Sequence, residues 1–467
     1  MRRITATLVY WLSKSPFMVW CDLFAPRTEK EPYSAFAQSL MDRGKEFERQ
    51  YDSTLGTLSH IDFKDIDDGF IKTRKLMKDG ADVITGMPLV DAGHQLEGIP
   101  DVLVKKTTHK SVFGRHHYVV QEVKSGRELK EEYVLQGAFY HLILGRIQGY
   151  TPRHFFIVTM EADGSPFVHK VDFERCEHRL KAALVKIQRI ADGSVLPPPN
   201  VKECDEPWQS FCLKKAKEQD DISLVANCGT DKQAFLRKAG MTTVRQLAAL
   251  TSQVDGIADS KLDQLRQCAR AFVEGKSHLM QPARIPSTDT ELFIDFEGME
   301  IDGEKHEYLL GILERTKGKT SFHAFVAKDP KDEGRMVKEA FAFLGKHPDA
   351  PIFHYAPYEK TALKALAERN GMNAQQVIDR LVDLLQVCRR CVAPSTSTFR
   401  LKDFGKSLGA SWREGMNAAQ SMVLYQDYLA TKDAKILGKI IDYNEDDVRA
   451  ILMVKDWLVG NSAQADS

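Results

Sequence analysis

Two carboxylates stand on one apolar run in the second half of the chain. Residues 292–298 read Leu-Phe-Ile-Asp-Phe-Glu-Gly, so that Asp295 and Glu297 are two positions apart. In a β-strand, side chains two positions apart project from the same face. An ionised carboxylate inside an apolar strand is unfavourable unless it is paired or ligated. The pattern therefore favours a metal site on this strand.

Two more acidic residues lie at places where a fold can bring them to that strand. Glu359 follows an apolar run that ends at Tyr355, and Asp447 follows Tyr443 by four residues. Four carboxylates can hold two divalent cations about 4 Å apart, which suits in-line attack of water on a phosphodiester. The alternative is that Asp447 belongs to the solvated acidic face of a helix and that the Asp-x-Glu strand is incidental.

A second set with similar chemistry lies in the first half of the chain. Asp101 follows Gly-Ile-Pro, and Glu122 and Lys124 share one face of a strand-like run at 118–124. Carboxylates are the ligands that Mg²⁺ and Mn²⁺ prefer. A lysine beside them can polarise the attacking water or stabilise the charged transition state. The alternative is a surface aspartate with an exposed Glu–Lys pair on an edge strand.

Two predicted helices complete this second set. A helix over 130–146 places Gln136 and Tyr140 one turn apart on one face. An early helix over 43–48 carries Glu46, Phe47 and Glu48.

This second set resembles the PD-(D/E)XK nucleases, in the branch that looks like RecB nuclease domains. The resemblance rests on Pro100-Asp101, Glu122-x-Lys124 and Gln136-x-x-x-Tyr140, and it covers residues 1–200. It implies metal binding by Asp101 and Glu122, and catalytic roles for Asp101, Glu122, Lys124, Gln136 and Tyr140. Members of this branch often carry a metal-binding histidine where this chain has Phe47. This ligand is therefore expected to be either lost or replaced by Glu48 or Glu46.

The acidic set of the second half resembles that of the DEDD exonucleases, over about residues 288–460. Asp295-x-Glu297 matches the first motif, Tyr355-x-x-Tyr358-Glu359 the second and Tyr443-x-x-x-Asp447 the third. The resemblance implies metal binding by Asp295, Glu297, Glu359 and Asp447, a water-orienting hydroxyl at Tyr443, and removal of nucleotides from 3′ ends. Glu359 and Tyr355 depart from the usual aspartate and asparagine. Asp383 and Lys402 match flanking positions and are expected near the substrate groove.

The elements that must position these residues predict an α/β multidomain chain. Residues 1–200 alternate helix and strand, as a restriction-endonuclease-like core does, and end at three consecutive prolines. Residues 201–285 are expected to be a helical connector. This segment also resembles helix-hairpin-helix elements, with a turn at Gly240 and a helix N-cap at Thr242 or Thr243. Residues 286–467 predict three strands, a helix and a strand, the order of an RNase H-like fold.

Composition narrows the class of protein without naming a partner. The chain has 467 residues, and basic and acidic residues number 65 each, so net charge neither indicates nor excludes nucleic-acid binding. It carries no apolar run long enough for a membrane span, and we expect no membrane association. Eight cysteines in so long a chain predict thiols in a reducing compartment, with the cytoplasm as the default location.

Relatives in the RecB-like branch can hold an iron–sulfur cluster, which requires four thiolates. Here Ser15 stands in place of the N-terminal cysteine, and Pro207 stands between Cys204 and Cys212 where another is expected. The sequence therefore argues against a cluster, and Cys204 and Cys212 are expected to be ordinary buried or free cysteines.

The function predicted from the sequence is that of a Mg²⁺- or Mn²⁺-dependent nuclease acting on DNA, on single strands or duplex ends. A helicase or a repair or defence protein is the kind of partner that this activity implies. Two rivals remain open. One is a nucleic-acid-binding or processing protein with one or both centres inactive, and the other is an RNA exonuclease, because no residue here reads the sugar.

Overall fold

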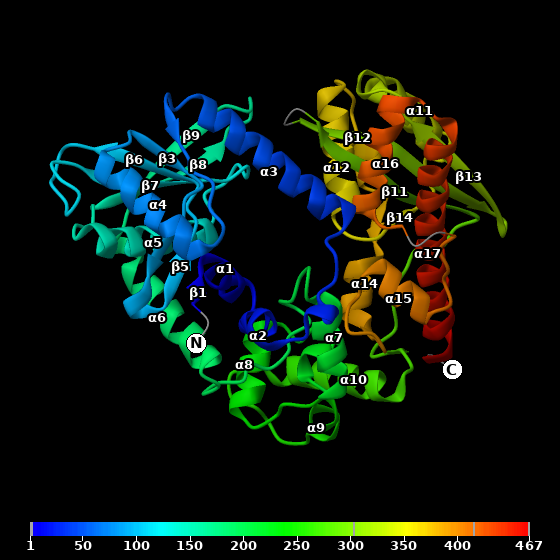
Figure 1. Cartoon of the computed structure of the whole chain (residues 1–467). Helices are drawn as coiled ribbons and strands as arrows, with labels where there is room; N and C mark the ends of the chain where they lie inside the picture. Colours follow the sequence, from blue (N-terminus) through cyan, green and yellow to red (C-terminus); the bar gives the residue numbers. More distant parts are fainter. Residues whose placement is uncertain (1–2, 302–303, 414–415, 466–467) are drawn as a thin grey trace. The chain divides into compact units, whose positions relative to one another are not determined.

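The computed structural model describes residues 3–301, 304–413 and 416–465. The chain forms two compact units, Met1–Lys214 and Lys215–Ser467, which are drawn in Figure 1 and described separately below. None of the helices in the described ranges is both long and apolar enough to cross a membrane.

The first unit is built on a six-stranded sheet with strand order β2-β3-β6-β7-β8-β9. Its strands are β2 (Leu58–Ser59), β3 (Val83–Thr85), β6 (Val102–Lys106), β7 (His117–Val123), β8 (His154–Met160) and β9 (Pro166–Asp172). β6 and β7 are antiparallel, whereas β7 and β8 are parallel. A parallel pair needs a crossover connection, and α5 (Glu131–Gln148) supplies it, which confirms the helix predicted over 130–146.

Helix α5 is buried almost all round because it lies between the sheet and other helices. It contacts β7 and β8, and also α1 and α6. Gly137 lies so close to Phe155 and Ile157 of β8 that a Cβ at this position would collide with both side chains. The remaining helices are α1 (Ala6–Lys14), α2 (Pro16–Phe24), α3 (Ala35–Ser53), α4 (Ile66–Asp79) and α6 (Glu174–Ala191), and a small sheet joins β1 (Ile4–Thr5), β5 (Leu96–Gly98) and β4 (Leu89–Asp91).

The second unit contains a five-stranded sheet in the order β13-β12-β11-β14-β15. Its strands are β11 (Thr290–Ile301), β12 (Glu304–Thr316), β13 (Lys319–Val326), β14 (Ile352–His354) and β15 (Leu381–Asp383). The first three are antiparallel, and β14 and β15 add in parallel. With α11 (Glu333–Gly345) between β13 and β14, the predicted order of three strands, helix and strand is confirmed. The short strand β15 was not predicted.

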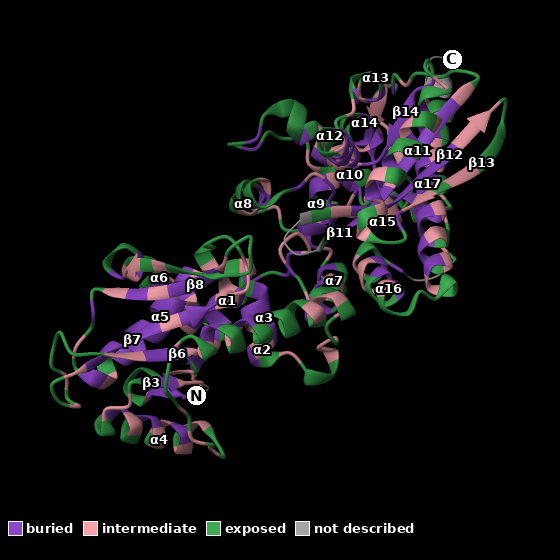
Figure 2. Ribbon diagram, turned by 90° about the horizontal axis from the view of Figure 1, so that it is seen from above, coloured by how far each residue is buried: buried purple, intermediate pink, exposed green. Residues whose placement is uncertain are grey.

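Helices cover both faces of this sheet, so β11 is apolar along most of its length. Leu292, Ile294 and Phe296 pack with residues of α11 and α12 (Tyr358–Arg369). Phe293, on the opposite face, packs with residues of α17 (Ala434–Ala465). Figure 2 shows the resulting band of buried residues along the central strands. Asp295 and Glu297 alternate in phase with Phe293 and therefore lie on the α17 face.

Short helices lead into this sheet, as the sequence predicts. They are α7 (Gln209–Glu218), which crosses the boundary between the units, α8 (Thr230–Lys238), α9 (Val244–Ala249) and α10 (Asp259–Glu274). Thr243 is the N-cap of α9, and Gln246 closes a capping box. Beyond α10, β10 (His278–Leu279) pairs with β16 (Val392–Ala393). The unit also contains helices α13 (Gln375–Ile378), α14 (Leu384–Cys391), α15 (Leu401–Ser407) and α16 (Ala418–Thr431).

The backbone amides at the start of α9 already have acceptors within the protein. The side-chain oxygen of Gln246 accepts from the amides of Thr242 and Thr243. Asp220 accepts from the next two amides, through its carbonyl and its carboxylate. A helix-hairpin-helix element offers such amides to a DNA phosphate, so these contacts favour the interpretation as a helical connector.

A buried ion pair fastens α17 to the start of β11. Lys455 Nζ donates to Glu291 Oε1 at 2.7 Å, and both side chains are almost fully buried. Arg315 on β12 also pairs with Glu291 and, at 2.7 Å, with the half-exposed Asp456. Burial acts to raise the pKa of Glu291, but the hydrogen bonds from Lys455 and Arg315 outweigh it and hold this pKa below its ordinary value.

Replacing Lys455 by methionine is expected to lower the free energy of unfolding by about 3 kcal/mol, because Glu291 keeps its charge in a buried place with one partner fewer. A carboxylate with a lowered pKa stabilises the fold above its unfolded pKa and loses that contribution as pH falls. The loss in K455M should therefore shrink in acid. Urea unfolding between about pH 4 and about pH 7 measures this.

The matched control is Asp456→Asn, which removes an exposed partner of Arg315 and should cost less than about 1 kcal/mol. An equal loss in both variants, or a loss in K455M that does not change with pH, would contradict the role assigned to the buried pair.

Candidate active sites

Three carboxylates meet beneath α17 in the second unit. One oxygen from each of Asp295, Glu297 and Asp447 lies within 4.8 Å of the others. The first two come from β11, which carries them on one face, and the third comes from α17. The structure thus brings together three of the four metal ligands expected from the sequence.

The acidic run before Asp447 divides between two directions. Arg413 holds Asp446 and Glu445, with nitrogen–oxygen distances of 2.9 Å to each. Asp447 turns inward instead and accepts a hydrogen bond from Trp412 Nε1 at 2.7 Å. The run is therefore not simply a solvated acidic face, which was the alternative interpretation of the sequence.

Asn444 fixes Asp295 from the same helix. Its Nδ2 donates to Asp295 Oδ2 at 2.8 Å and to the Asp295 carbonyl oxygen at 3.2 Å. Gly311, the partner of Asp295 across β12, leaves room for this amide, because a Cβ at Gly311 would overlap Asn444 Oδ1. Sequence reasoning missed Asn444, although it stands directly after Tyr443 within the acidic run.

Burial raises the pKa of each carboxyl in the cluster, and repulsion from the neighbouring carboxylates adds to this for Asp295 and Glu297. The pKa of Glu297 is raised to about 8 by burial and by Asp447, and that of Asp447 to about 6 by burial. Burial raises the pKa of Asp295 further, together with Asp447 and Glu297. Three hard oxygen donors that repel one another are suited to a divalent cation, which would relieve this repulsion.

Hydroxyl groups support Glu297 on its other side. The Tyr308 hydroxyl lies 3.5 Å from Glu297 Oε2 and 2.8 Å from the hydroxyl of Ser421 on α16. All three side chains are buried. These two positions carry no motif and were not predicted from the sequence.

Glu359 lies beside the cluster but is engaged elsewhere. Its Oε2 is 3.3 Å from Nδ1 of the buried His354, and that nitrogen is 2.7 Å from the carbonyl oxygen of Ala356. Because a carbonyl only accepts, Nδ1 carries the proton. Ala356 has a φ of 112°, so the turn that presents Glu359 is strained. The charge of Glu359 is still close enough to contribute to the raised pKa of Asp295.

Tyr443 and Lys402 lie next to Asp447. The Tyr443 hydroxyl donates to the Asp447 carboxylate, and burial is the main cause that raises the pKa of Tyr443. Lys402 Nζ lies 4.6 Å from the centre of the Tyr443 ring. Burial lowers the pKa of Lys402, and the nearby Asp447 acts in the opposite direction.

Asp383 has a structural position as an N-cap. One of its oxygens accepts from the amides of Leu385 and Gln386 at the start of α14, and from the amide of Ala356 at 3.3 Å. Asp383 therefore ties β15 to the strained turn before Glu359.

The first unit brings a smaller charged set together. Glu122 near the end of β7 is 2% exposed and pairs with Lys124 at 2.8 Å. Asp101 Oδ2 accepts from the amide of Val123 at 2.6 Å, across the sheet from β6. Burial, and then Glu122, raises the pKa of Asp101. Among the described residues, Glu122 Oε2 is buried without a hydrogen-bond partner, which leaves a donor oxygen that fits a cation.

Of the two replacement ligands expected on α3, only Glu48 faces this set. Glu48 is half-buried, and burial raises its pKa; among charged groups, Lys124 and then Glu122 act on it most strongly. Glu46 is exposed and pairs with Arg49 at 2.6 Å. Phe47 is 4% exposed and packs against strand residues of the sheet, so a core side chain occupies the histidine position.

Tyr140 approaches the set from α5. Glu122 and Asp101 add to the burial that raises the pKa of Tyr140. Its ring packs against Gly98, where a Cβ would collide with it. Gln136, one turn earlier on α5, is half-buried. The glycine before Pro100-Asp101 thus has a packing role that the sequence did not disclose.

The prediction of unpaired thiols is wrong for two cysteines. Cys204 and Cys212 form a disulfide, with Cα atoms 6.4 Å apart. The turn before α7 brings these residues within bridging distance. Ser15 Oγ lies 4.0 Å from the sulfur of Cys204. The other six cysteines are buried thiols, and Cys228 belongs to the second unit.

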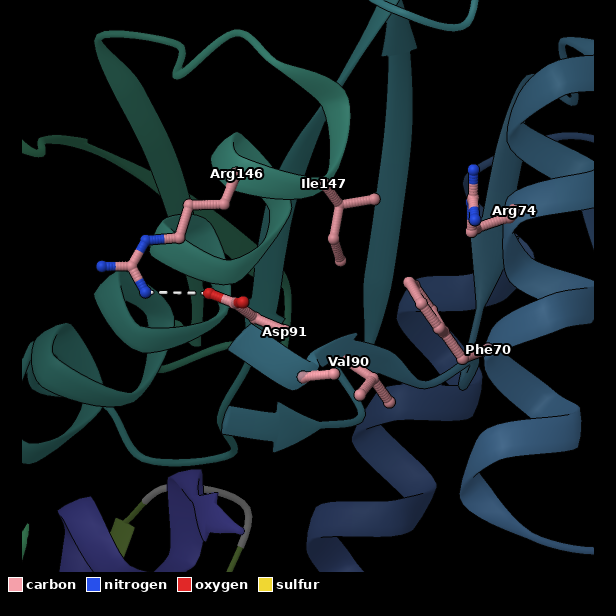
Figure 3. A pocket seen from close by; sticks show the side chains of 7 residues that line it. Phe70, Arg74, Val90, Asp91, Arg146 and Ile147 are labelled. Atoms are coloured by element: carbon pink, nitrogen blue, oxygen red, sulfur yellow. Dashed lines mark hydrogen bonds and ion pairs between the residues drawn. The ribbon is translucent and has the colours of Figure 1, made fainter. Parts of the chain in front are cut away.

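A surface hollow of about 240 Å³ lies elsewhere in the first unit (Figure 3). It is lined by Phe70, Val90 and Ile147 and by the aliphatic and charged parts of Arg74 and Arg146, and Arg146 donates to Asp91 at 2.8 Å. Arg146 stands ten residues beyond Gln136 on α5, or about 15 Å along the helix. None of the predicted site residues lines this hollow.

The order of strands and helices in the second unit is that of an RNase H-like fold, with the carboxylate cluster on its central strand and on α17. Residues 292–459 match the family model of the RNase H superfamily. The match supports a nucleic acid as the substrate and phosphodiester hydrolysis as the reaction, and nucleases of this type generally use divalent metals. It does not extend to the first unit. No curated protein matches the chain.

Replacing Glu297 by glutamine is expected to stabilise the protein in EDTA. A carboxyl with a raised folded pKa makes stability fall as pH rises from the unfolded pKa to the folded one, here from 4.5 to about 8. The free energy of unfolding of E297Q should therefore exceed that of the wild type by on the order of 1 kcal/mol near pH 8, and the difference should be small near pH 5. Urea unfolding at both pH values measures the difference.

Asp442→Asn, which changes an exposed partner of Arg413, should show no such pH dependence. Added Mn²⁺ should raise the unfolding midpoint of the wild type more than that of E297Q. Equal pH profiles for E297Q and the wild type would show that Glu297 is not under this repulsion.

Proposed function

We propose that the second unit is a metal-dependent exonuclease that removes nucleotides from the 3′ end of DNA, preferably single-stranded. The observation that carries the proposal is the cluster of Asp295, Glu297 and Asp447 on an RNase H-like sheet, in which Glu297 and Asp447 are buried. Tyr443, hydrogen-bonded to Asp447, supports the DEDD assignment because it offers a hydroxyl beside the carboxylates.

Each residue of this cluster has a distinct part in the proposal. Asp295, Glu297 and Asp447 would hold the cations, with Glu359 as a fourth ligand beside them. Mg²⁺ or Mn²⁺ would supply charge neutralisation on the phosphate and activation of water. Asn444 and Trp412 orient two of the carboxylates through their N–H groups, and the Tyr443 hydroxyl orients the attacking water.

We also propose that the first unit is a RecB-like PD-(D/E)XK nuclease centre. The antiparallel β6–β7 pair, the parallel β8 and the crossover helix α5 support it, since they gather Asp101, Glu122 and Lys124 at one end of the sheet. Lys124 would stabilise charge on the phosphate, and Glu48 would replace the missing histidine. The proposed domains are then a RecB-like nuclease over residues 1–200, a helical connector over 201–285 and an exonuclease over 286–467.

Two alternatives differ from this proposal in substrate or in activity. An RNA exonuclease would shorten RNA oligonucleotides in preference to matched DNA. A binding or processing protein with inactive centres would bind strands without shortening them in any divalent metal. The ion pair between Lys124 and Glu122 favours an inactive centre in the first unit only. Lys124 already compensates the negative charge of Glu122, which would otherwise attract a cation.

Replacing Asp295 by alanine is expected to lower 3′-end trimming by at least roughly 100-fold, because the change removes a ligand from the centre of the cluster. Single-stranded DNA labelled separately at each end, with Mg²⁺ or Mn²⁺, reports the polarity, and a matched RNA is digested in parallel. Asp456→Asn, which alters an exposed carboxylate of the same unit, is the control. Undiminished trimming by D295A would refute the assignment.

Replacing Lys124 by alanine in the D295A background is expected to remove the cutting that remains. The lysine lies against Glu122 and Asp101, so its loss takes away the one cation of that set. Lys105→Ala, which removes a lysine of β6 that pairs with the exposed Asp82, is the matched control. Residual cutting that survives K124A would mean that the first unit is not the source of it.

A further inference from the structure

Two lysines of α15 near the carboxylate cluster lie against aromatic rings and have no acidic partner among the described residues. Among the described residues, neither Lys402 nor Lys406 forms an ion pair or a side-chain hydrogen bond. Each Nζ lies 5.9 Å from the ring of Trp412. They are four positions apart, so they share one face of the helix, with Cβ atoms about 5–6 Å apart.

Other cations near the cluster are already neutralised. Arg413 contacts three carboxylates, those of Asp442, Glu445 and Asp446. Arg449 pairs with Glu445 at 2.6 Å. These two arginines therefore add little attraction for a further anion, whereas the charges of Lys402 and Lys406 remain available.

The two lysines differ in depth. Lys402 is half-buried over the Tyr443 ring, and the charges of Asp447, Lys406 and Glu297 act on it in that order. Lys406 is exposed one turn farther along α15. A line from the carboxylates through Lys402 to Lys406 thus leads from the buried cluster to the surface.

We infer that Lys402 and Lys406 form a binding site for the backbone phosphates of a single nucleic-acid strand, on the 5′ side of the bond that is cut. Lys402 contacts the phosphate next to the scissile one, and Lys406 contacts the phosphate after that. Trp412 is half-buried and its ring centre lies 5.9 Å from each Nζ, so it offers aromatic surface beside the two lysines for a nucleotide. The inference rests on the proposed 3′ exonuclease function, and it assigns the strand's path into that site.

The test uses single-stranded DNA in which one linkage at a time is an uncharged methylphosphonate. Release of the first 3′ nucleotide is measured with Mn²⁺ for the full-length wild type, K402M and K406M. On unmodified DNA, we expect each variant to lower kcat/KM roughly tenfold, mainly through KM. An uncharged second linkage from the 3′ end should abolish the difference between K402M and the wild type. An uncharged third linkage should do so for K406M.

Controls separate a phosphate contact from a structural effect. Lys402→Arg keeps the charge and should retain most activity. Lys338→Met changes an exposed lysine of α11, far from α15 in the sequence, and should behave as the wild type. A loss in K402M that is equal on all substrates would mean that Lys402 only positions Tyr443, and the inference would be overturned. No loss at all would overturn it equally.

Binding distinguishes failure of this inference from failure of the proposed function. If the wild type never shortens DNA, the exonuclease proposal fails, and equilibrium binding of the unmodified strand then decides the phosphate site. Each lysine-to-methionine change should reduce the slope of log affinity against log salt by about 0.7. Slopes identical to that of the wild type would refute the site.

Discussion

Repulsion among buried carboxylates is the constraint on which the second unit depends. Asp295, Glu297 and Asp447 are held within 4.8 Å of one another, although like charges in a low dielectric oppose this arrangement. The sheet and α17 must therefore be joined by other interactions. Asn444 joins them at the cluster, Lys455 pairs with Glu291 at the other end of the contact, and apolar side chains fill the space between.

The two units treat buried negative charge differently. In the first, Lys124 pairs directly with Glu122, so part of the charge is compensated without a cation. In the second, the nearest lysine, Lys402, lies over an aromatic ring and makes no ion pair with the cluster, among the residues that the structure describes. The second cluster consequently depends more strongly on divalent cations for neutrality. Because of this difference, the second unit is the stronger candidate for a metal-dependent active site.

Departures from the resembled families follow from packing. Phe47 fills the core between α3 and the sheet, so a metal ligand at that position would require a polar cavity that is not there. Cys204 and Cys212, which are eight positions apart, form a disulfide with each other. Glu359 is longer than the expected aspartate, and its carboxylate reaches His354.

The sequence by itself determined the elements and the local spacing of the charged residues. Alternation along β11 placed Asp295 and Glu297 on one face, and helical spacing placed Gln136 and Tyr140 together, because both periodicities are properties of the backbone. Only the tertiary structure decided which distant groups meet them. Asn444 opposite Gly311, Trp412 on Asp447, Tyr308 with Ser421, and His354 on Glu359 depend on how strands and helices pack. Local pattern carries no signal for such contacts, since their energy comes from groups far apart in the chain.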